Sequence, residues 1–84
     1  MIIIARHKKM DFTFAQRLEQ IMHERQLYAS DLSKITGIPE RTIRDYTSGI
    51  YMPNAFAIKR IAVTLNISAD YLLGIKSSAV NRRG

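Results

Sequence analysis

The stretch from Leu32 to Pro53 constrains the fold of this chain more than any other part, because it consists of two short helical segments that each end in a glycine. Glycine stops a helix by adopting the left-handed conformation, and both glycines stand where a helix would end. The apolar positions of the stretch are Leu32, Ile35, Ile38, Ile43 and Tyr46. They recur at helical spacing, with long polar side chains between the later ones. Two short helices that share a core, the second with a polar outer face, form a shape that fits the major groove of DNA.

Length and composition exclude several other classes of protein. Eighty-four residues make one small domain with a modest core. The chain has no cysteine, so it has neither a disulfide framework nor a thiolate metal site. Three consecutive isoleucines near the start are too few for a signal-peptide core or a membrane span. We therefore expect a soluble, cytoplasmic protein.

The net charge of +6 suggests a polyanionic partner, but the excess lies outside the centre of the chain. Between Asp11 and Ile75 seven basic and seven acidic side chains balance each other. The excess cations are Arg6, Lys8, Lys9, Lys76, Arg82 and Arg83. We expect a basic arm at 1–11, a domain at 12–75 and a basic tail at 76–84, with either Met1 or Met10 as the true start. The cations either contact DNA phosphates, which adds salt-dependent affinity without sequence information, or stay solvated.

Five short helices are expected, which makes the fold class all-α. The first runs from about Thr13, a plausible N-cap, to Gln26; the second covers 29–36 and the third 39–48. Asn54 caps a fourth, and Ser68 caps a fifth that ends at Gly74. The side chains predicted to face the core are Phe14, Leu18, Ile21, Met22, Leu32, Ile35, Ile43, Tyr46, Ile58, Ile61, Ala62 and Leu65. Tyr46 and Tyr71 are interpreted as packing residues, whereas Ile50, Tyr51 and Met52 form an exposed apolar loop.

From about Phe14 to Gly74 the chain resembles the lambda-repressor-like DNA-binding domains, the Cro/XRE family of bacterial and phage regulators. The matching positions are Leu27, Leu32, Gly37, Ile38, Thr42, Ile43, Tyr46, Gly49, Pro53, Ile61, Ala62, Leu65, Ile67, Ser68 and residues 71–74. Their joint spacing requires no gap. The resemblance implies a five-helix fold whose helix-turn-helix, at helices 2 and 3, places helix 3 in the major groove. It also implies a homodimer on paired half-sites about one DNA turn apart.

The base-reading positions of that family, at the start and middle of its third helix, correspond here to Glu40, Arg41, Thr42, Arg44 and Asp45. Arginine can donate two hydrogen bonds to guanine, worth about 1–3 kcal/mol of discrimination. The two acids can accept from cytosine or can orient the arginines, since each acid lies four residues from an arginine. The alternative is that all four are solvated surface charges in weak i,i+4 pairs.

Three positions depart from the family pattern. Where the second helix of the family often starts with Ser or Thr followed by Gln, this chain has Tyr28 and Ala29. Where the family often has a basic residue after the second glycine, this chain has Ile50. The expected phosphate contacts are therefore backbone N–H groups or neutral side chains, supplemented by the arm. They are Ala29, Ser30, Thr47, Ser48, Tyr51 and Asn54, with Arg6, Lys8 and Lys9. We expect the domain alone to bind DNA more weakly than a typical relative.

Enzyme function is not indicated by the sequence. His7 and His23 have no matching ligand cluster, and no phosphate-binding glycine loop or nucleophile constellation is present. No cofactor, metal or small-molecule ligand is expected.

The favoured interpretation is a sequence-specific regulator of double-stranded DNA, a small repressor of phage or mobile-element type that blocks polymerase. Candidates for a dimer contact are Leu73, Ile75 and Val80.

Two alternatives remain. The first is a protein-interaction module of the antitoxin kind whose DNA contacts have weakened, which Ala29, Ile50 and the electrically neutral domain favour. The second is non-specific binding of nucleic acid through the basic tails alone.

Overall fold

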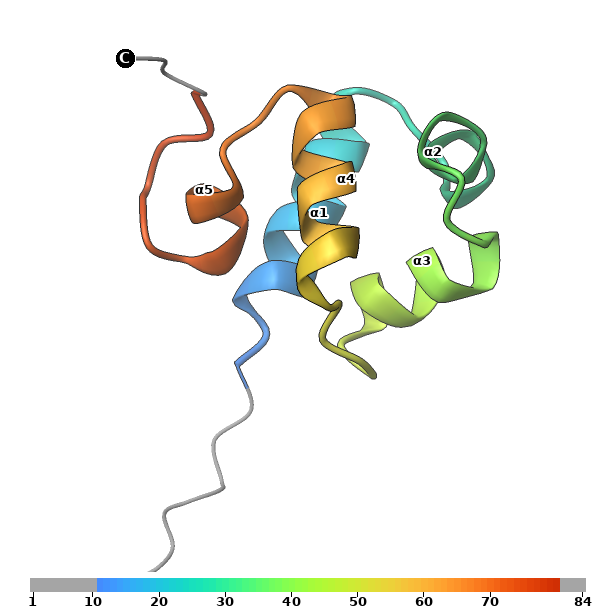
Figure 1. Cartoon of the computed structure of the whole chain (residues 1–84), viewed down its shortest axis with the longest axis horizontal. Helices are drawn as coiled ribbons and strands as arrows, with labels where there is room; N and C mark the ends of the chain where they lie inside the picture. Colours follow the sequence, from blue (N-terminus) through green and yellow to red (C-terminus); the bar gives the residue numbers. More distant parts are fainter. Residues whose placement is uncertain (1–10, 81–84) are drawn as a thin grey trace, which may run out of the picture.

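The computed structural model describes residues 11–80, which form five α-helices and no strand (Figure 1). The helices are α1 (Thr13–Glu24), α2 (Ala29–Thr36), α3 (Glu40–Ser48), α4 (Ala55–Leu65) and α5 (Ala69–Leu73). The predicted all-α class is confirmed, with α2 and α3 as the helix-turn-helix pair.

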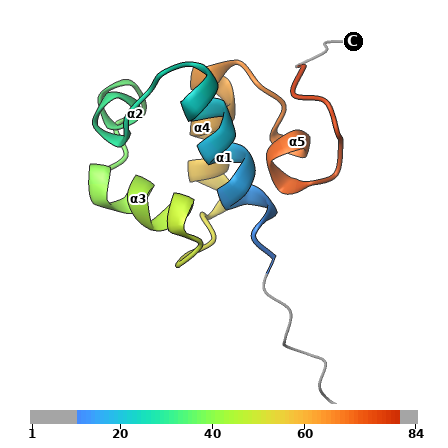
Figure 2. The same ribbon diagram turned by 180° about the vertical axis from the view of Figure 1, so that it is seen from behind.

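The five helices enclose a single core. α2 packs against α3, while α3 and α5 pack against α1, and α4 contacts α2 and α5. α4 lies in the foreground of Figure 1, with α2 and α3 on one side and α5 on the other. Figure 2 shows α1 on the opposite side of the molecule. Each helix contributes one side chain to the set of largest fully buried residues, which are Leu18, Leu32, Ile43, Ile61 and Leu72. Removing any one of them would leave a cavity that touches several helices.

Most of the predicted core positions are confirmed, but the prediction that Ile35 faces the core is wrong. Its side chain is 52% exposed, whereas Thr36 is buried in its place. Thr36 lies one helical turn after Leu32 and donates a hydrogen bond from its Oγ1 to the Leu32 carbonyl at 2.6 Å. The same oxygen accepts the backbone N–H of Ile38 at 3.2 Å. Because the Thr36 hydroxyl both donates and accepts a hydrogen bond, its burial carries little desolvation cost.

The predicted helix stops are confirmed. Gly37, Gly49 and Gly74 all have φ angles in the left-handed region. The side chain of Asn54 accepts the N–H of Ala57 at 2.9 Å and so caps α4. Ser68 caps α5 in the same way, by accepting the N–H of Tyr71 at 3.2 Å.

The predicted N-cap of the first helix, Thr13, is wrong. Thr13 is the first helical residue, and the Asp11 carboxylate accepts its backbone N–H at 3.0 Å. This N–H, and less strongly the Thr13 hydroxyl, lowers the pKa of Asp11 from the ordinary value of 3.8. A carboxylate suits this position because the N-terminus of a helix carries partial positive charge.

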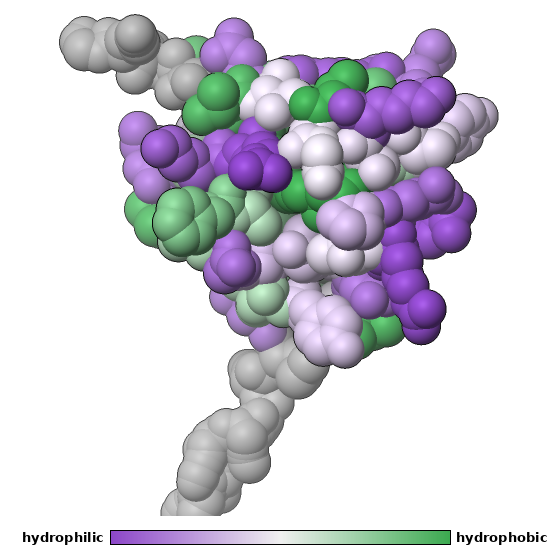
Figure 3. Space-filling model, turned by 45° about the vertical axis from the view of Figure 1, so that its right-hand side comes forward, coloured by the Kyte–Doolittle hydropathy of each residue, from purple (hydrophilic) through white to green (hydrophobic). Residues whose placement is uncertain are grey.

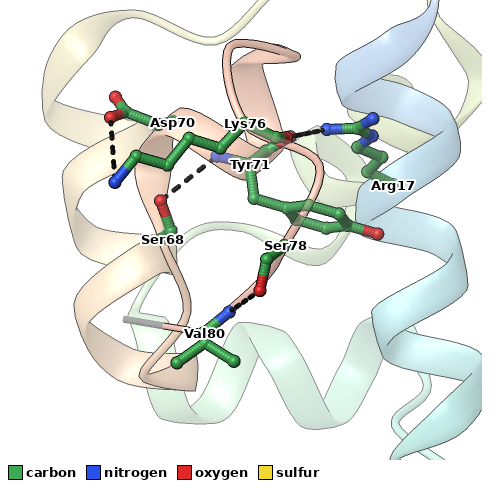
Figure 4. A network of polar contacts seen from close by, with 7 residues as sticks. All are labelled: Arg17, Ser68, Asp70, Tyr71, Lys76, Ser78 and Val80. Carbon is green, nitrogen blue, oxygen red and sulfur yellow. Dashed lines mark hydrogen bonds and ion pairs between the residues drawn. The ribbon is translucent and has the colours of Figure 1, made fainter. Parts of the chain in front are cut away.

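Arg17, on α1, forms hydrogen bonds with α5 and with the chain that follows it (Figure 4). Its guanidinium donates to the carbonyls of Tyr71 at 2.5 Å and Lys76 at 2.7 Å, and it lies 4.4 Å from the centre of the Tyr71 ring. The Ser68 N–H also donates to the Ala79 carbonyl at 3.1 Å. The chain between residues 76 and 79, which the sequence assigns to the tail, therefore still contacts the domain.

Gln26, which follows α1, has a φ angle of +57° although it carries a Cβ. The left-handed conformation costs such a residue about 1–2 kcal/mol, and glycine avoids this at an entropic cost of about 0.5–1 kcal/mol. We therefore expect Gln26→Gly to raise the free energy of unfolding, measured in urea, by about 0.5–1 kcal/mol. Asn66→Gly is the matched control, since Asn66 has a φ angle of +55° but asparagine tolerates this region. Equal effects of the two substitutions would contradict the prediction.

Candidate nucleic-acid interface

α3 is fixed to the core along one side. Ile43 is fully buried and Tyr46 nearly so. The Tyr46 ring meets the Phe14 ring edge to face, with centroids 6.1 Å apart and an angle of 84° between the planes. This geometry is favourable for an aromatic pair and ties α3 to α1. The interpretation of Tyr46 as a packing residue is confirmed.

The five predicted base-reading residues line the remaining surface of α3. The side chains of Arg41 and Arg44 are exposed, and those of Glu40, Thr42 and Asp45 are half-buried. The structure thus brings these residues together on one short helix, held by its buried side. Their contact with bases stays a prediction.

The two arginines of α3 differ in what holds them. Arg44 forms an ion pair with Glu40 one turn earlier. The other pair of equal spacing, Arg41 with Asp45, is not formed, and Arg41 makes no ion pair or side-chain hydrogen bond within residues 11–80. An exposed pair contributes only about 0.2–1 kcal/mol, so Glu40 orients Arg44 without immobilising it. Arg41 can bind a ligand without first losing a partner.

The start of α2 offers backbone donors beside a carboxylate. The Asp31 carboxylate accepts the Tyr28 N–H at 2.8 Å, which leaves the N–H groups of Ala29 and Ser30 at the helix end. Ala29 and Thr47, two of the predicted phosphate contacts, line the same surface hollow. The structure therefore brings the start of α2 close to the end of α3. A phosphate here would gain the positive end of the helix but would also meet the Asp31 charge.

The remaining predicted phosphate contacts fall into three groups. Thr47 and Asn54 are partly engaged, because the Thr47 hydroxyl donates to the Arg44 carbonyl at 3.1 Å and Asn54 caps α4. Ser48 and Tyr51 are exposed and form no side-chain hydrogen bond within the part of the chain that the structure describes. The arm residues Arg6, Lys8 and Lys9 lie outside the described residues.

Arg17 and Arg25, two of the seven basic residues between Asp11 and Ile75, donate hydrogen bonds to distant backbone carbonyls. Arg17 holds the chain after α5, and Arg25 donates to the Leu65 carbonyl at the end of α4 at 2.5 Å. Their partners lie 54 and 40 residues away or more, so no local pattern indicates them.

The surface around α2 and α3 is mixed. Figure 3 brings these helices forward and shows hydrophilic side chains with separate apolar patches between them. The predicted exposure of Ile50, Tyr51 and Met52, in the loop after α3, is confirmed. Within residues 11–80 no cluster of His, Cys, Asp and Glu is suited to a metal ion. None of the described helices is long and apolar enough to cross a membrane.

Comparison with known proteins identifies the same region. A family model described as helix-turn-helix matches residues 16–72, which is about two thirds of the chain and extends from α1 into α5. No curated protein and no solved structure matches the chain. The resemblance drawn from the sequence, between about Phe14 and Gly74, covers the matched residues.

Proposed function

Because the chain belongs to the Cro-type helix-turn-helix family, a family of DNA-binding transcription regulators that are generally not enzymes, we propose that it recognises a specific duplex sequence. The proposed role is that of a small cytoplasmic repressor, of phage or mobile-element type, that covers an operator and blocks polymerase. The unit that reads DNA is the domain at 12–75, and the basic segments on either side add affinity.

This proposal rests on one observation, which is that α3 has one buried side and one exposed polar side. Its buried side is anchored by Ile43 and Tyr46, while its exposed side carries Arg41 and Arg44. A rigidly held helix can position an arginine fork against the O6 and N7 atoms of guanine in the major groove. Glu40, Thr42 and Asp45 are the further base contacts that we propose on this helix.

We also propose that the protein binds as a homodimer. A two-fold dimer would engage two half-sites about one DNA turn, or about 34 Å, apart. Leu73, Ile75 and Val80 support this proposal because all three are exposed apolar residues at the C-terminal side of the domain. An apolar contact between them would remove these side chains from water.

The proposed function is tested by selecting bound duplexes from a random library at about 0.15 M salt, where non-specific binding is weak. Enrichment of one motif is the expected result, and the spacing of its halves would report the dimer geometry. No enrichment by a protein that is folded and helical by circular dichroism would contradict the proposal.

Replacing Lys8 and Lys9 by alanine is expected to weaken binding to every duplex by the same factor. Phosphate contacts carry no sequence information, and each lost contact should flatten the dependence of log affinity on log salt by about 0.9. Fluorescence anisotropy at several salt concentrations measures both effects. Arg82→Ala with Arg83→Ala is the parallel variant at the other end, and it measures the contribution of the C-terminal segment separately. An unchanged salt dependence would mean that the arm lysines stay solvated.

A protein-interaction module is the second candidate function. Its specific support is the exposed apolar loop of Ile50, Tyr51 and Met52, whose first residue stands where the family often has a basic residue. A stable complex with a protein partner, together with no duplex binding near physiological salt, would favour this candidate.

A further inference from the structure

α4, which lies in the foreground of Figure 1, carries two large apolar side chains that the rest of the domain does not cover. Phe56 is 81% exposed and Val63, two turns later, is 69% exposed. Lys59 and Arg60 stand between them at helical spacing and are also exposed. We call these four residues the α4 face. Two large apolar side chains on one helical stripe mark a surface that gains free energy when it is covered.

An apolar groove adjoins the α4 face. It runs between α4 and the start of α5 and has a volume of about 330 Å³. Its lining residues are Ala55, Ile58, Lys59, Ala62, Val63, Ile67 and Ala69. Lys59 is the one charged residue among them. The small alanine side chains leave room for an apolar side chain of a partner to lie beside Val63.

The charges on this face have a single sign. From Tyr46 to Ala69 the sequence contains no aspartate or glutamate, so α4 and the loop before it carry only the cations Lys59 and Arg60. Lys59 forms no ion pair within residues 11–80, and Arg60 makes one long hydrogen bond, 3.4 Å to the Thr36 carbonyl. The next carboxylate along the chain, Asp70, is paired with Lys76 at 3.9 Å. No carboxylate of the face itself neutralises the two cations.

Charge decides which occupant fits. A second copy of this chain, docked about a two-fold axis, would place Lys59 and Arg60 opposite their own counterparts, which is unfavourable. A nucleic acid backbone would satisfy the cations but would leave Phe56 and Val63 against phosphates and water. A helix with an apolar stripe bordered by carboxylates matches both features.

We propose that the α4 face docks an acidic amphipathic helix of a partner protein. The apolar side chains of that helix cover Phe56 and Val63, and its carboxylates pair with Lys59 and Arg60. The face lies on α4, separate from the exposed side chains of α3 that the proposed function assigns to DNA.

The test uses two synthetic 18-residue helical peptides and the full chain labelled with ¹⁵N. One peptide has leucines along one stripe with flanking glutamates, and the other has lysines in place of those glutamates. The glutamate peptide is expected to shift the amide signals of residues 55–69 with a Kd at least about tenfold lower than that of the lysine peptide, since one tenfold step is 1.4 kcal/mol. Lys59→Glu is expected to remove that preference.

A double variant, Phe56→Ser with Val63→Ser, should weaken the glutamate peptide at least about tenfold while the melting temperature and duplex binding stay unchanged. Ile50→Ser with Met52→Ser is the matched control, because these residues are exposed and apolar but lie outside the α4 face. All peptide titrations are done without DNA, so a failed duplex selection and a failed peptide titration are separate results.

Three outcomes would overturn the proposal. The first is equal binding of both peptides, or shifts confined to residues outside 55–69. The second is self-association of the free chain that Phe56→Ser abolishes, which would assign the face to a second copy. The third is a separate titration with duplex DNA alone that shifts the same amide signals of residues 55–69, which would assign the face to nucleic acid.

Discussion

Replacement of Arg41 by alanine is expected to reduce discrimination between the preferred duplex and a duplex changed at one base pair by about 5- to 150-fold. This range corresponds to the 1–3 kcal/mol that a bidentate arginine–guanine contact contributes. Arg41 is the arginine of α3 that makes no ion pair within residues 11–80, so its fork is available to a base at no cost in lost contacts. Its side chain is exposed, and its removal should leave the fold unchanged.

The measurement combines duplex selection with anisotropy titrations of matched and mismatched sites. Arg41→Lys is the first control, because lysine keeps the charge but lacks the planar fork, and it should lose most of the discrimination. Arg44→Ala is the second, and we expect it to act at a different base pair, because Arg44 lies almost one turn further along α3. A uniform fall in affinity for all duplexes would show that Arg41 contacts phosphate and reads no base.

Most features of the fold that depend on neighbours in the sequence were predictable, although the start of α1 was placed wrongly. A glycine in the left-handed conformation, as at Gly37 and Gly49, or a cap such as Asn54, needs only residues three or four positions away. The periodicity of apolar residues indicated the buried side of α1, α3 and α4 for the same reason. The core and the order of elements followed from such local signals.

Features that depend on distant residues were not predictable. The choice between Ile35 and Thr36 as the buried residue of α2 is decided by what packs there, and apolarity alone selects the wrong one. Arg17 has its partners in and after α5, at the other end of the domain. Nothing near Arg17 in the sequence distinguishes it from a solvated arginine.

The candidate site shows the same division. Spacing alone suggests two equal ion pairs on α3, but only Glu40 with Arg44 forms. The order of the charges accounts for the difference, since an acid that precedes its cation by four residues is the more favourable arrangement in a helix. In the pair of Arg41 and Asp45 the cation comes first. The family resemblance identified the positions, and the structure shows that Arg44 forms an ion pair on α3 whereas Arg41 does not.

Gly49→Ala is expected to lower the free energy of unfolding more than Gly37→Ala does, although both glycines have a φ angle of +79°. The conformation alone costs an alanine about 1–2 kcal/mol at either position. At residue 37 a Cβ would have its nearest neighbour at 3.7 Å, an ordinary contact with Arg60. At residue 49 it would lie 2.6 Å and 2.7 Å from two ring carbons of Phe12, which no native contact permits. Chemical denaturation of both variants gives the comparison.

A third variant separates ring contact from backbone strain. Phe12 is partly exposed and packs on Gly49 at the end of α3, so Phe12→Ala should itself cost little more than the area it uncovers. In the Phe12→Ala background, Gly49→Ala should cost only the conformational part, about 1–2 kcal/mol, and so match Gly37→Ala. If its cost stays the same in both backgrounds, the ring does not restrict residue 49. Gly49 ends α3, so a Cβ that collides with the Phe12 ring should also shift the end of α3. We therefore expect Gly49→Ala to weaken duplex binding when Phe12 is present, and to leave it unchanged in the Phe12→Ala variant.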